Sequence, residues 1–327
     1  MALDAGGIKP AAQNRGQPRK GLVGIVLKIG VAGGLLAYVF SRVDLRAVSR
    51  VLSTVDPLML ALAVVLACLS FPLGGIRWWC IVSALGDCAS PRLLTGLFWL
   101  AGLVAQVLPN PMGDAVRISV AARLGLGLGT AFRSAFLERV VMLAGLVILM
   151  AATQPILRQR IGTSASPWLA VVFALCALGG LVLLATADRL LLRFRRLRFI
   201  DALISLSAGF RRLLASRWVI PVLSSVFFSH LNTILVAIVL GAALDLPLSA
   251  SDYLAAIPLA ILAVVLPVSI GGWGMREGVM LAILGAMGVP AAMALAFSLM
   301  LGVIGMVAAL PGLVMLWHRP GAQLGPQ

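Results

Sequence analysis

The sequence predicts an all-helical protein that crosses a membrane several times. Hydrophobic residues make up 61% of the 327 residues and charged residues only 11%, far from the balance of a soluble globular domain. The apolar residues form runs long enough to span hydrocarbon as helices, whereas a membrane barrel would show short segments of alternating hydrophobicity. We therefore predict a polytopic α-helical fold with about six full crossings and two broken, re-entrant helical hairpins.

Charge and cysteine usage exclude several other classes. The net charge of +15 could suggest nucleic acid, but the Lys and Arg residues lie mostly beside apolar runs, which is typical of membrane topology. We therefore expect no nucleic-acid partner. The four scattered cysteines form no CxxC pair, so neither a disulfide framework nor a metal site is indicated. The glycine-rich stretch 125–129 lacks a following Lys-Ser or Lys-Thr pair, and no nucleotide or other cofactor is expected.

One transmembrane domain is expected over residues 21–317. The polar, basic tail 1–20 is predicted to be disordered and cytoplasmic, and 318–327 form a C-terminal tail. No small-residue cleavage site follows the first apolar run, which favours a retained helix. The expected crossings are 21–40, 57–73, 130–152, 167–187, 218–244 and 291–317. We interpret Arg77-Trp78-Trp79, which follows the second run, as an anchor in the headgroup layer.

A basic segment divides this domain into a first half, 21–187, and a second half, 218–317. Residues 189–217 contain eight arginines, with Leu190, Phe194 and Leu197 on one helical face. Such a pattern predicts a basic amphipathic helix that lies on an anionic phospholipid surface.

Counting crossings identifies the segments that enter without crossing. If both the N-terminal tail and the basic segment face the cytoplasm, an even number of crossings must separate them, yet five apolar runs lie between. Residues 93–125 are interrupted by prolines and a glycine, so this run is predicted to enter from the cytoplasm and return. Residues 253–288 break in the same way and are predicted to enter from outside. Both chain termini would then be cytoplasmic.

The two breaks resemble each other. LPNPMGDAVR at 108–117 and LPVSIGGWGMREG at 266–278 share Leu-Pro, a glycine four residues after the proline, and an arginine shortly beyond. Matching breaks with opposite entry are the pattern of an inverted repeat. The expected structural hinges are Pro109, Gly113, Pro267, Gly271 and Gly272. We expect the breaks to meet near the membrane centre, with Arg117 and Arg276 facing one cavity.

The candidate substrate-binding residues are the charged side chains at membrane depth. These residues are Asp114, Arg117, Glu138, Arg139, Arg276 and Glu277. Arg276 and Glu277 open the returning half-helix, where unpaired N–H groups favour an anion, although Glu277 could simply neutralise the helix start. Asp114 and Arg117 lie three residues apart, so a local ion pair competes with a role in the cavity. Adjacent Glu138 and Arg139 need separate partners, for which we expect Arg117 and a lipid phosphate.

These motifs are similar to those of a known family. The Gly-Asp-x-x-Arg motif from Gly113, Glu138-Arg139, and the Gly-x-Arg-Glu-Gly motif from Gly274 resemble the lysylphosphatidylglycerol synthase transmembrane-region family. That flippase-like membrane domain also occurs in the multiple peptide resistance factor. Met112 stands where the family more often has a second glycine. The resemblance implies a protein that moves or presents a lipid across the bacterial inner membrane, here without the soluble aminoacyltransferase domain of the synthases.

The leading functional hypothesis is a lipid translocase or lipid-binding transporter that works without ATP hydrolysis and is not an enzyme. Its arginines would hold a polar or phosphate-bearing headgroup, of a phospholipid or an isoprenoid lipid, while the chains stay in the bilayer. One alternative is an intramembrane enzyme on lipid-linked substrates, with Glu138 or Glu277 as a base. Another is a non-transporting scaffold for a lipid-pathway enzyme, docked through 189–217.

Overall fold

The computed structural model describes residues 45–108, 110–162, 168–191, 198–265 and 273–314. The regular structure of these residues is entirely helical, as the sequence predicts. The helices are α2 (Leu45–Ser53), α3 (Pro57–Ala84), α4 (Pro91–Val107), α5 (Asn110–Ala121), α6 (Leu128–Ile161), α7 (Trp168–Leu191), α8 (Arg198–Ala215), α9 (Val219–Ala243), α10 (Ala250–Val265), α11 (Met275–Ala286) and α12 (Ala291–Ala309). A π-helical turn, Ala122–Leu126, precedes α6, and a 3₁₀ turn, Leu310–Leu313, follows α12.

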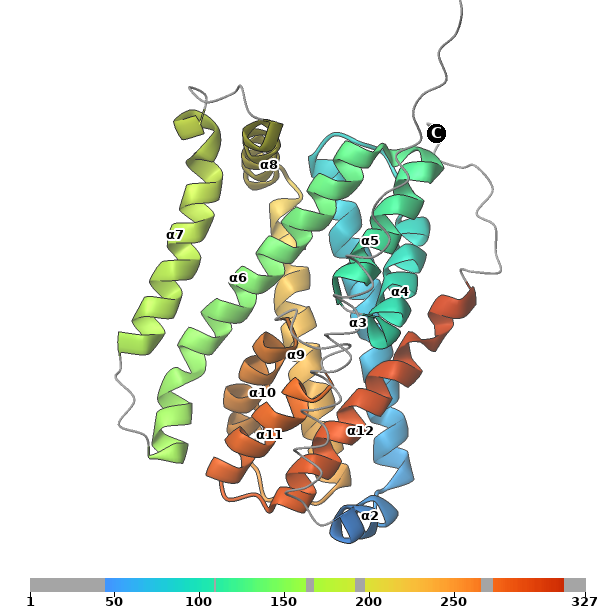
Figure 1. Ribbon diagram of the computed structural model, residues 1–327, viewed down its shortest axis with the longest axis vertical. Coiled ribbons are helices and arrows are strands. Elements are labelled where there is room, and N and C mark those ends of the chain that lie inside the picture. The colour runs from blue at the N-terminus through green and yellow to red at the C-terminus, as the bar shows by residue number, and fades with distance from the viewer. Residues whose placement is uncertain (1–44, 109, 163–167, 192–197, 266–272, 315–327) are drawn as a thin grey trace, which may run out of the picture.

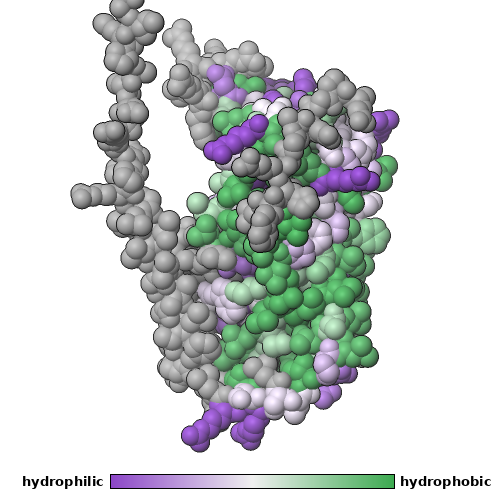
Figure 2. Space-filling model, turned by 90° about the vertical axis from the view of Figure 1, so that its right-hand side faces the viewer, coloured by the Kyte–Doolittle hydropathy of each residue, from purple (hydrophilic) through white to green (hydrophobic). Residues whose placement is uncertain are grey.

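Among the described residues, four segments are long and apolar enough to cross a membrane, which makes this a multi-pass membrane protein. They are Pro57–Ala84, Leu128–Ile161, Val219–Ala243 and Ala291–Leu313. Helix α7 packs beside α6 at the left edge of the bundle in Figure 1. Figure 2 shows a broad hydrophobic belt between hydrophilic ends, as expected of a surface in contact with lipid. The predicted crossing 21–40 lies outside the described residues.

Helix α3 illustrates how the sequence defines an element. Asp56 caps its start, where the carboxylate accepts hydrogen bonds from the backbone N–H groups of Leu58, at 2.8 Å, and Met59. Pro57 occupies the first turn, where its missing N–H costs nothing. Pro72 lies inside the helix without ending it. The predicted end at residue 73 is therefore wrong, and α3 continues to Ala84.

The first broken segment is a hairpin confined to one half of the molecule. Helices α4 and α5 have 17 and 12 residues, fewer than the roughly 20 that a crossing needs. They lie side by side in the upper half of Figure 1, so the chain enters and leaves at the same end. Gly113 allows this close approach, because a Cβ there would lie 2.4 Å from the carbonyl oxygen of Ala101.

The second broken segment is a hairpin in the opposite half. Helices α10 and α11 have 16 and 12 residues, lie against each other, and occupy the lower half of Figure 1. Their connection, 266–272, is outside the described residues. Two short helical hairpins that enter from opposite ends agree with the predicted inverted arrangement.

Helix α12 lies close to both hairpins near their inner ends. A Cβ at Gly302 would lie 2.3 Å from Arg276 Nη2, near the start of α11. A Cβ at Gly305 would lie 3.2 Å from Gln106 Nε2, near the end of α4. Three residues of helix correspond to about 4.5 Å along the axis. The inner ends of the hairpins therefore approach each other along one turn of α12.

One helix lies at each end of the bundle. Helix α8 lies at the upper end of Figure 1 and is seen nearly end-on, so it runs across the bundle. Helix α2 lies at the lower end. Within α8, Leu206, Phe210 and Leu213 are buried, whereas Arg212 and Leu214 are exposed. Helix α8 therefore has one face packed on the protein and another available to its surroundings.

Candidate functional site

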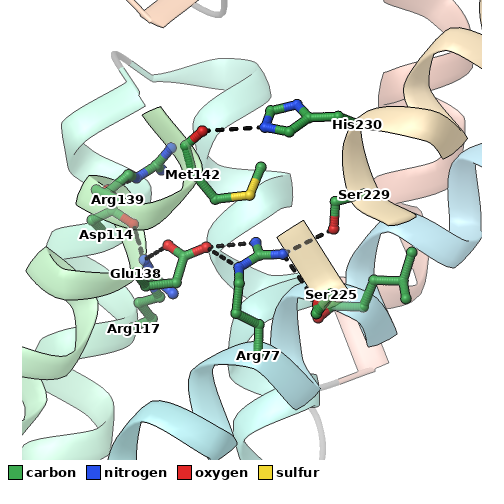
Figure 3. A network of polar contacts seen from close by, with 10 residues as sticks. Arg77, Asp114, Arg117, Glu138, Arg139, Met142, Ser225, Ser229 and His230 are labelled. Atoms are coloured by element: carbon green, nitrogen blue, oxygen red, sulfur yellow. Dashed lines mark hydrogen bonds and ion pairs between the residues drawn. The ribbon is translucent and has the colours of Figure 1, made fainter. Parts of the chain in front are cut away.

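Five charged side chains from three helices form a connected network beside the first hairpin (Figure 3). Arg77 comes from α3, Asp114 and Arg117 from α5, and Glu138 and Arg139 from α6. Arg77, Arg117 and Glu138 are almost completely buried. Because isolated ions are costly inside a membrane protein, the arrangement of their partners decides what this network can do.

Glu138 is the centre of the network. Its Oε1 accepts hydrogen bonds from Arg77 Nη2 at 2.6 Å and from Arg77 Nε at 3.0 Å. Its Oε2 accepts a hydrogen bond from Arg117 Nη2 at 3.0 Å. One buried carboxylate therefore neutralises parts of two arginines and ties α3, α5 and α6 together.

Hydroxyl groups of α9 complete the surroundings of Arg77. Arg77 Nη1 donates to Ser229 Oγ at 2.8 Å and to Ser225 Oγ at 3.4 Å. Ser225 Oγ in turn donates to the carbonyl oxygen of Leu73 at 2.8 Å. All three nitrogens of the Arg77 guanidinium therefore have partners, as a buried cation requires.

Arg117 is buried but not fully paired. Its Nε donates to Asp114 Oδ1 at 2.8 Å, and its guanidinium lies over the rings of Trp78 and Phe98, with centroid distances of 4.8 and 5.0 Å. Trp78 is itself held by a 2.9 Å hydrogen bond from Nε1 to Ser134 Oγ. Arg117 Nη1 has no hydrogen-bond partner among the described residues. This nitrogen leaves the network with an unused buried donor.

Arg139 is the exposed member of the network. Its Nε donates to Asp114 Oδ2 at 2.8 Å, and its side chain is 55% exposed, compared with 22% for Asp114. Arg139 is the twelfth residue of α6, so it lies about 16 Å along the helix from Leu128, well inside the span. A half-exposed guanidinium at this depth lies at the protein surface rather than in its core.

The network carries one excess positive charge. Three arginines face two carboxylates, and Asp114 serves two of the arginines at once. The excess charge is nearest the surface at Arg139, the most exposed of the five. Such a group attracts an anion, for which a guanidinium offers donors matched to phosphate.

A second, smaller cluster lies at the start of α11. Glu277 Oε1 accepts from Arg276 Nη2 at 2.6 Å and from Ser298 Oγ at 3.3 Å, while Oε2 accepts from the N–H of Gly274 at 2.6 Å. Arg276 also lies over the ring of Trp273, 4.7 Å from its centroid. Glu277 therefore caps its own helix and neutralises the adjacent arginine.

The six predicted residues therefore fall into two groups. Asp114, Arg117, Glu138 and Arg139 join the first network, and the expected pair of Glu138 with Arg117 is present. Arg276 and Glu277 form the second cluster, and no hydrogen bond joins the two groups within the described part of the chain. The cavity shared by Arg117 and Arg276 remains a prediction. A pocket of about 510 Å³ lies elsewhere, where α6 ends and α10 begins, beside Arg160 and Asp252.

The predicted role of Arg77 is wrong. The sequence pattern suggested an anchor in the headgroup layer. Instead, Arg77 and Trp78 are buried in α3, and Arg77 is the main partner of Glu138. Ser225, Ser229 and Ser298 were missed as well. An unbroken apolar run through Pro72 would have placed Arg77 at membrane depth, and this was the available signal.

The predicted hinges are only partly within the described structure. Pro109, Pro267, Gly271 and Gly272 lie outside the described residues. Gly113 lies within α5, where it provides the close contact with α4 noted above. His230 lies 3.1 Å from the carbonyl oxygen of Met142 through Nε2 (Figure 3).

Comparison with known proteins gives two findings. Residues 25–312 match the family described as the lysylphosphatidylglycerol synthase TM region. The glycosyltransferase AglD of Haloferax volcanii is 34% identical over 143 residues, an alignment that covers 39% of this chain and 23% of AglD. The chain thus matches about a quarter of that relative's length. Because the family match extends over most of the sequence, this chain belongs to the family of lysylphosphatidylglycerol synthase transmembrane regions.

Proposed function

We propose that this protein is a lipid translocase, or a lipid-binding transporter, that holds an anionic headgroup at Arg139 without hydrolysing ATP. The observation that carries this proposal is the network of three arginines and two carboxylates, whose most exposed member is an arginine within a membrane span. The excess positive charge suits a phosphate-bearing phospholipid or isoprenoid lipid. Its acyl or isoprenoid chains would remain beside the hydrophobic belt in Figure 2.

The two opposed hairpins support transport rather than static binding. The start of the returning half-helix α11 and the inner end of α4 both lie against one turn of α12. Half-helices that meet between opposed repeats are typical of transporters that expose one site alternately to the two sides. In the proposed cycle, the headgroup passes Arg139 and Arg276 on its way between the leaflets.

We assign the α8 end of the molecule to the cytoplasm of a bacterial inner membrane. The eight arginines of 189–217 then follow the positive-inside rule and contact anionic phospholipid. Five arginines would face outside, against this rule, but they are fewer than the eight of the basic segment; the five are Arg42, Arg46, Arg50, Arg158 and Arg160. Both chain termini are cytoplasmic in this topology.

Catalysis on a lipid-linked substrate is the second candidate, because the relative AglD is described as a glycosyltransferase. This role would require Glu138 or Glu277 as a general base. Both oxygens of each carboxylate already accept hydrogen bonds, and each carboxylate is paired with an arginine. A substrate proton would have to compete with these contacts for either carboxylate. The contacts therefore favour transport over catalysis.

Reconstitution into liposomes tests the proposal. Purified protein should move fluorescent phosphatidylglycerol, or a labelled isoprenoid phosphate, between leaflets, as measured by chemical quenching of the outer leaflet. Arg139→Gln should slow this movement about tenfold or more, because it removes the charge that meets the headgroup.

Arg133→Gln is the matched control for this experiment. Arg133 lies on the same helix, but it bonds to Gly129 O and Thr130 Oγ1 within its own turn. Its loss should leave transport unchanged. Movement of no anionic lipid by the wild-type protein would contradict the proposal. Equal rates for Arg139→Gln and Arg133→Gln would remove Arg139 from the site.

The scaffold alternative makes a different prediction. Charge reversal in 189–217 would then abolish function, whereas Arg139→Gln would leave function unchanged.

A further inference from the structure

We propose that Asp114 is a built-in competitor for the anionic group of the ligand, so that it sets how readily the site releases its lipid. This inference rests on the proposed function, since it assumes that Arg139 meets a lipid anion. It assigns to Asp114 a role different from a simple structural ion pair. The geometry around Asp114 carries the argument (Figure 3).

Asp114 holds two arginines through opposite oxygens of one carboxylate. Oδ1 accepts from Arg117 Nε, and Oδ2 accepts from Arg139 Nε, both at 2.8 Å. Arg117 has a second anchor in Glu138, whereas Arg139 shows no other side-chain partner in the described part of the chain. The bond between Asp114 and Arg139 is therefore the contact in the network that can open without leaving a buried arginine unpaired.

Exposure identifies the same contact as the one that a ligand can reach. Arg139 is 55% exposed and Asp114 is 22% exposed, whereas the side chains of Arg77, Arg117 and Glu138 are at most 3% exposed. A lipid phosphate that approaches along α6 meets Arg139 first. Because a phosphate and a carboxylate compete for the same guanidinium donors, binding of the ligand weakens the bond to Asp114.

Arg117 gives the displaced carboxylate a place to remain. Asp114 contacts both Arg117 Nε and Arg117 Nη2, so it stays neutralised after Arg139 turns to the ligand. In addition, Arg117 Nη1 is a buried donor without a partner among the described residues. With Arg139 on the ligand, Arg77 and Arg117 balance Glu138 and Asp114, so exchange between Asp114 and the ligand leaves no isolated ion. A transporter benefits from such competition between Asp114 and the ligand, because the ligand must bind strongly enough to enter and weakly enough to be released.

Neutralising Asp114 tests the competition directly. Asp114→Asn keeps the size of the side chain but removes its charge. The affinity of the detergent-solubilised protein for fluorescent phosphatidylglycerol should rise about two- to fivefold, the range expected for one partly exposed ion pair. The rate of lipid movement in liposomes should fall, because release becomes slower. In the double variant Asp114→Asn/Arg139→Gln the gain in affinity should disappear.

Two outcomes separate this inference from the proposed function. If the wild-type protein binds no anionic lipid, both fail. If it binds, but Asp114→Asn binds equally or more weakly, only the inference is overturned, and Asp114 merely positions Arg139. If Asp114→Asn does not fold, a labelling experiment on the wild-type protein tests the inference instead. Labelling of Asp114 by a hydrophobic carbodiimide, measured by peptide mass spectrometry, should increase with phosphatidylglycerol but not with zwitterionic phosphatidylcholine. Unchanged labelling with both lipids would contradict the inference.

Discussion

Glu138→Gln is the substitution whose effect on stability follows most directly from the structure. Glu138 is buried and contacts two buried arginines at 2.6 and 3.0 Å. The substitution keeps the shape of the side chain but removes its negative charge. Arg117 retains Asp114, whereas Arg77 retains only the hydroxyl groups of Ser225 and Ser229. One arginine is then left as a buried cation without a counter-ion.

The expected cost is that of a broken buried ion pair, about 3–5 kcal/mol. The cost is the difference in the free energy of unfolding between the wild-type protein and the variant. It can be measured by titrating each purified protein from mild detergent into SDS and following helix content and tryptophan fluorescence. The double variant Arg77→Met/Glu138→Leu removes both charges of the pair and should be less destabilised than Glu138→Gln, because no unpaired Arg77 remains.

Asp245→Asn is a suitable control for this experiment. Asp245 is an exposed carboxylate in the turn after α9, so its neutralisation should change the free energy of unfolding by about 0.5 kcal/mol or less. If Glu138→Gln is as stable as the wild-type protein, the network does not hold α3, α5 and α6 together. If the double variant is less stable than Glu138→Gln, the cost does not arise from an unpaired arginine.

Two further substitutions test the hairpins and helix starts. Gly302→Ala should cost about 1–3 kcal/mol and slow lipid movement, because its Cβ would lie 2.3 Å from Arg276 Nη2 and 2.9 Å from Trp273, and the guanidinium of Arg276 is held by Glu277 and Trp273. Gly129→Ala, with nothing within 4 Å, should do neither. Equal behaviour of the two glycine variants would contradict the packing of α11 on α12. Asp56→Ala should cost about 1 kcal/mol in the SDS titration, because it removes the N-cap of α3; an unchanged transition would show that the cap is dispensable.

The helical membrane fold and both hairpins could be predicted because hydrocarbon restricts what a backbone can do. Prolines and glycines within an apolar run leave N–H and C=O groups without partners, so a break at membrane depth must face protein or a cavity. The two short pairs α4–α5 and α10–α11 follow from that constraint. The resemblance of 108–117 to 266–278 then indicated that they are related by inversion.

The extent of α3 was less predictable. A proline inside a helix usually suggests an end, and the sequence does not reveal that the helix passes Pro72. As a result, Arg77 appeared to belong to the headgroup layer. Its burial depends on α9, more than a hundred residues later in the chain, which supplies Ser225 and Ser229. Contacts of such sequence separation cannot be inferred from local pattern.

The sequence predicted most of the charged residues of the candidate site but not which of them bond to each other. Charges at membrane depth indicated functional residues, and Glu138 with Arg117 was the expected pair. Arg139 was assigned to lipid phosphate, and the structure adds that its Nε also contacts Asp114. A bond between residues 25 positions apart on different helices depends on how α5 packs against α6, which one sequence does not specify.

Lipid retained by the purified protein tests the central claim most directly. Native mass spectrometry should show an anionic lipid bound to the wild-type protein and to Arg133→Gln, identified by fragmentation of its phosphate-bearing headgroup. Arg139→Gln should lose this lipid while keeping its helix content. An equal amount of anionic lipid on Arg139→Gln, or none on the wild-type protein under conditions that preserve its fold, would contradict a headgroup site at Arg139.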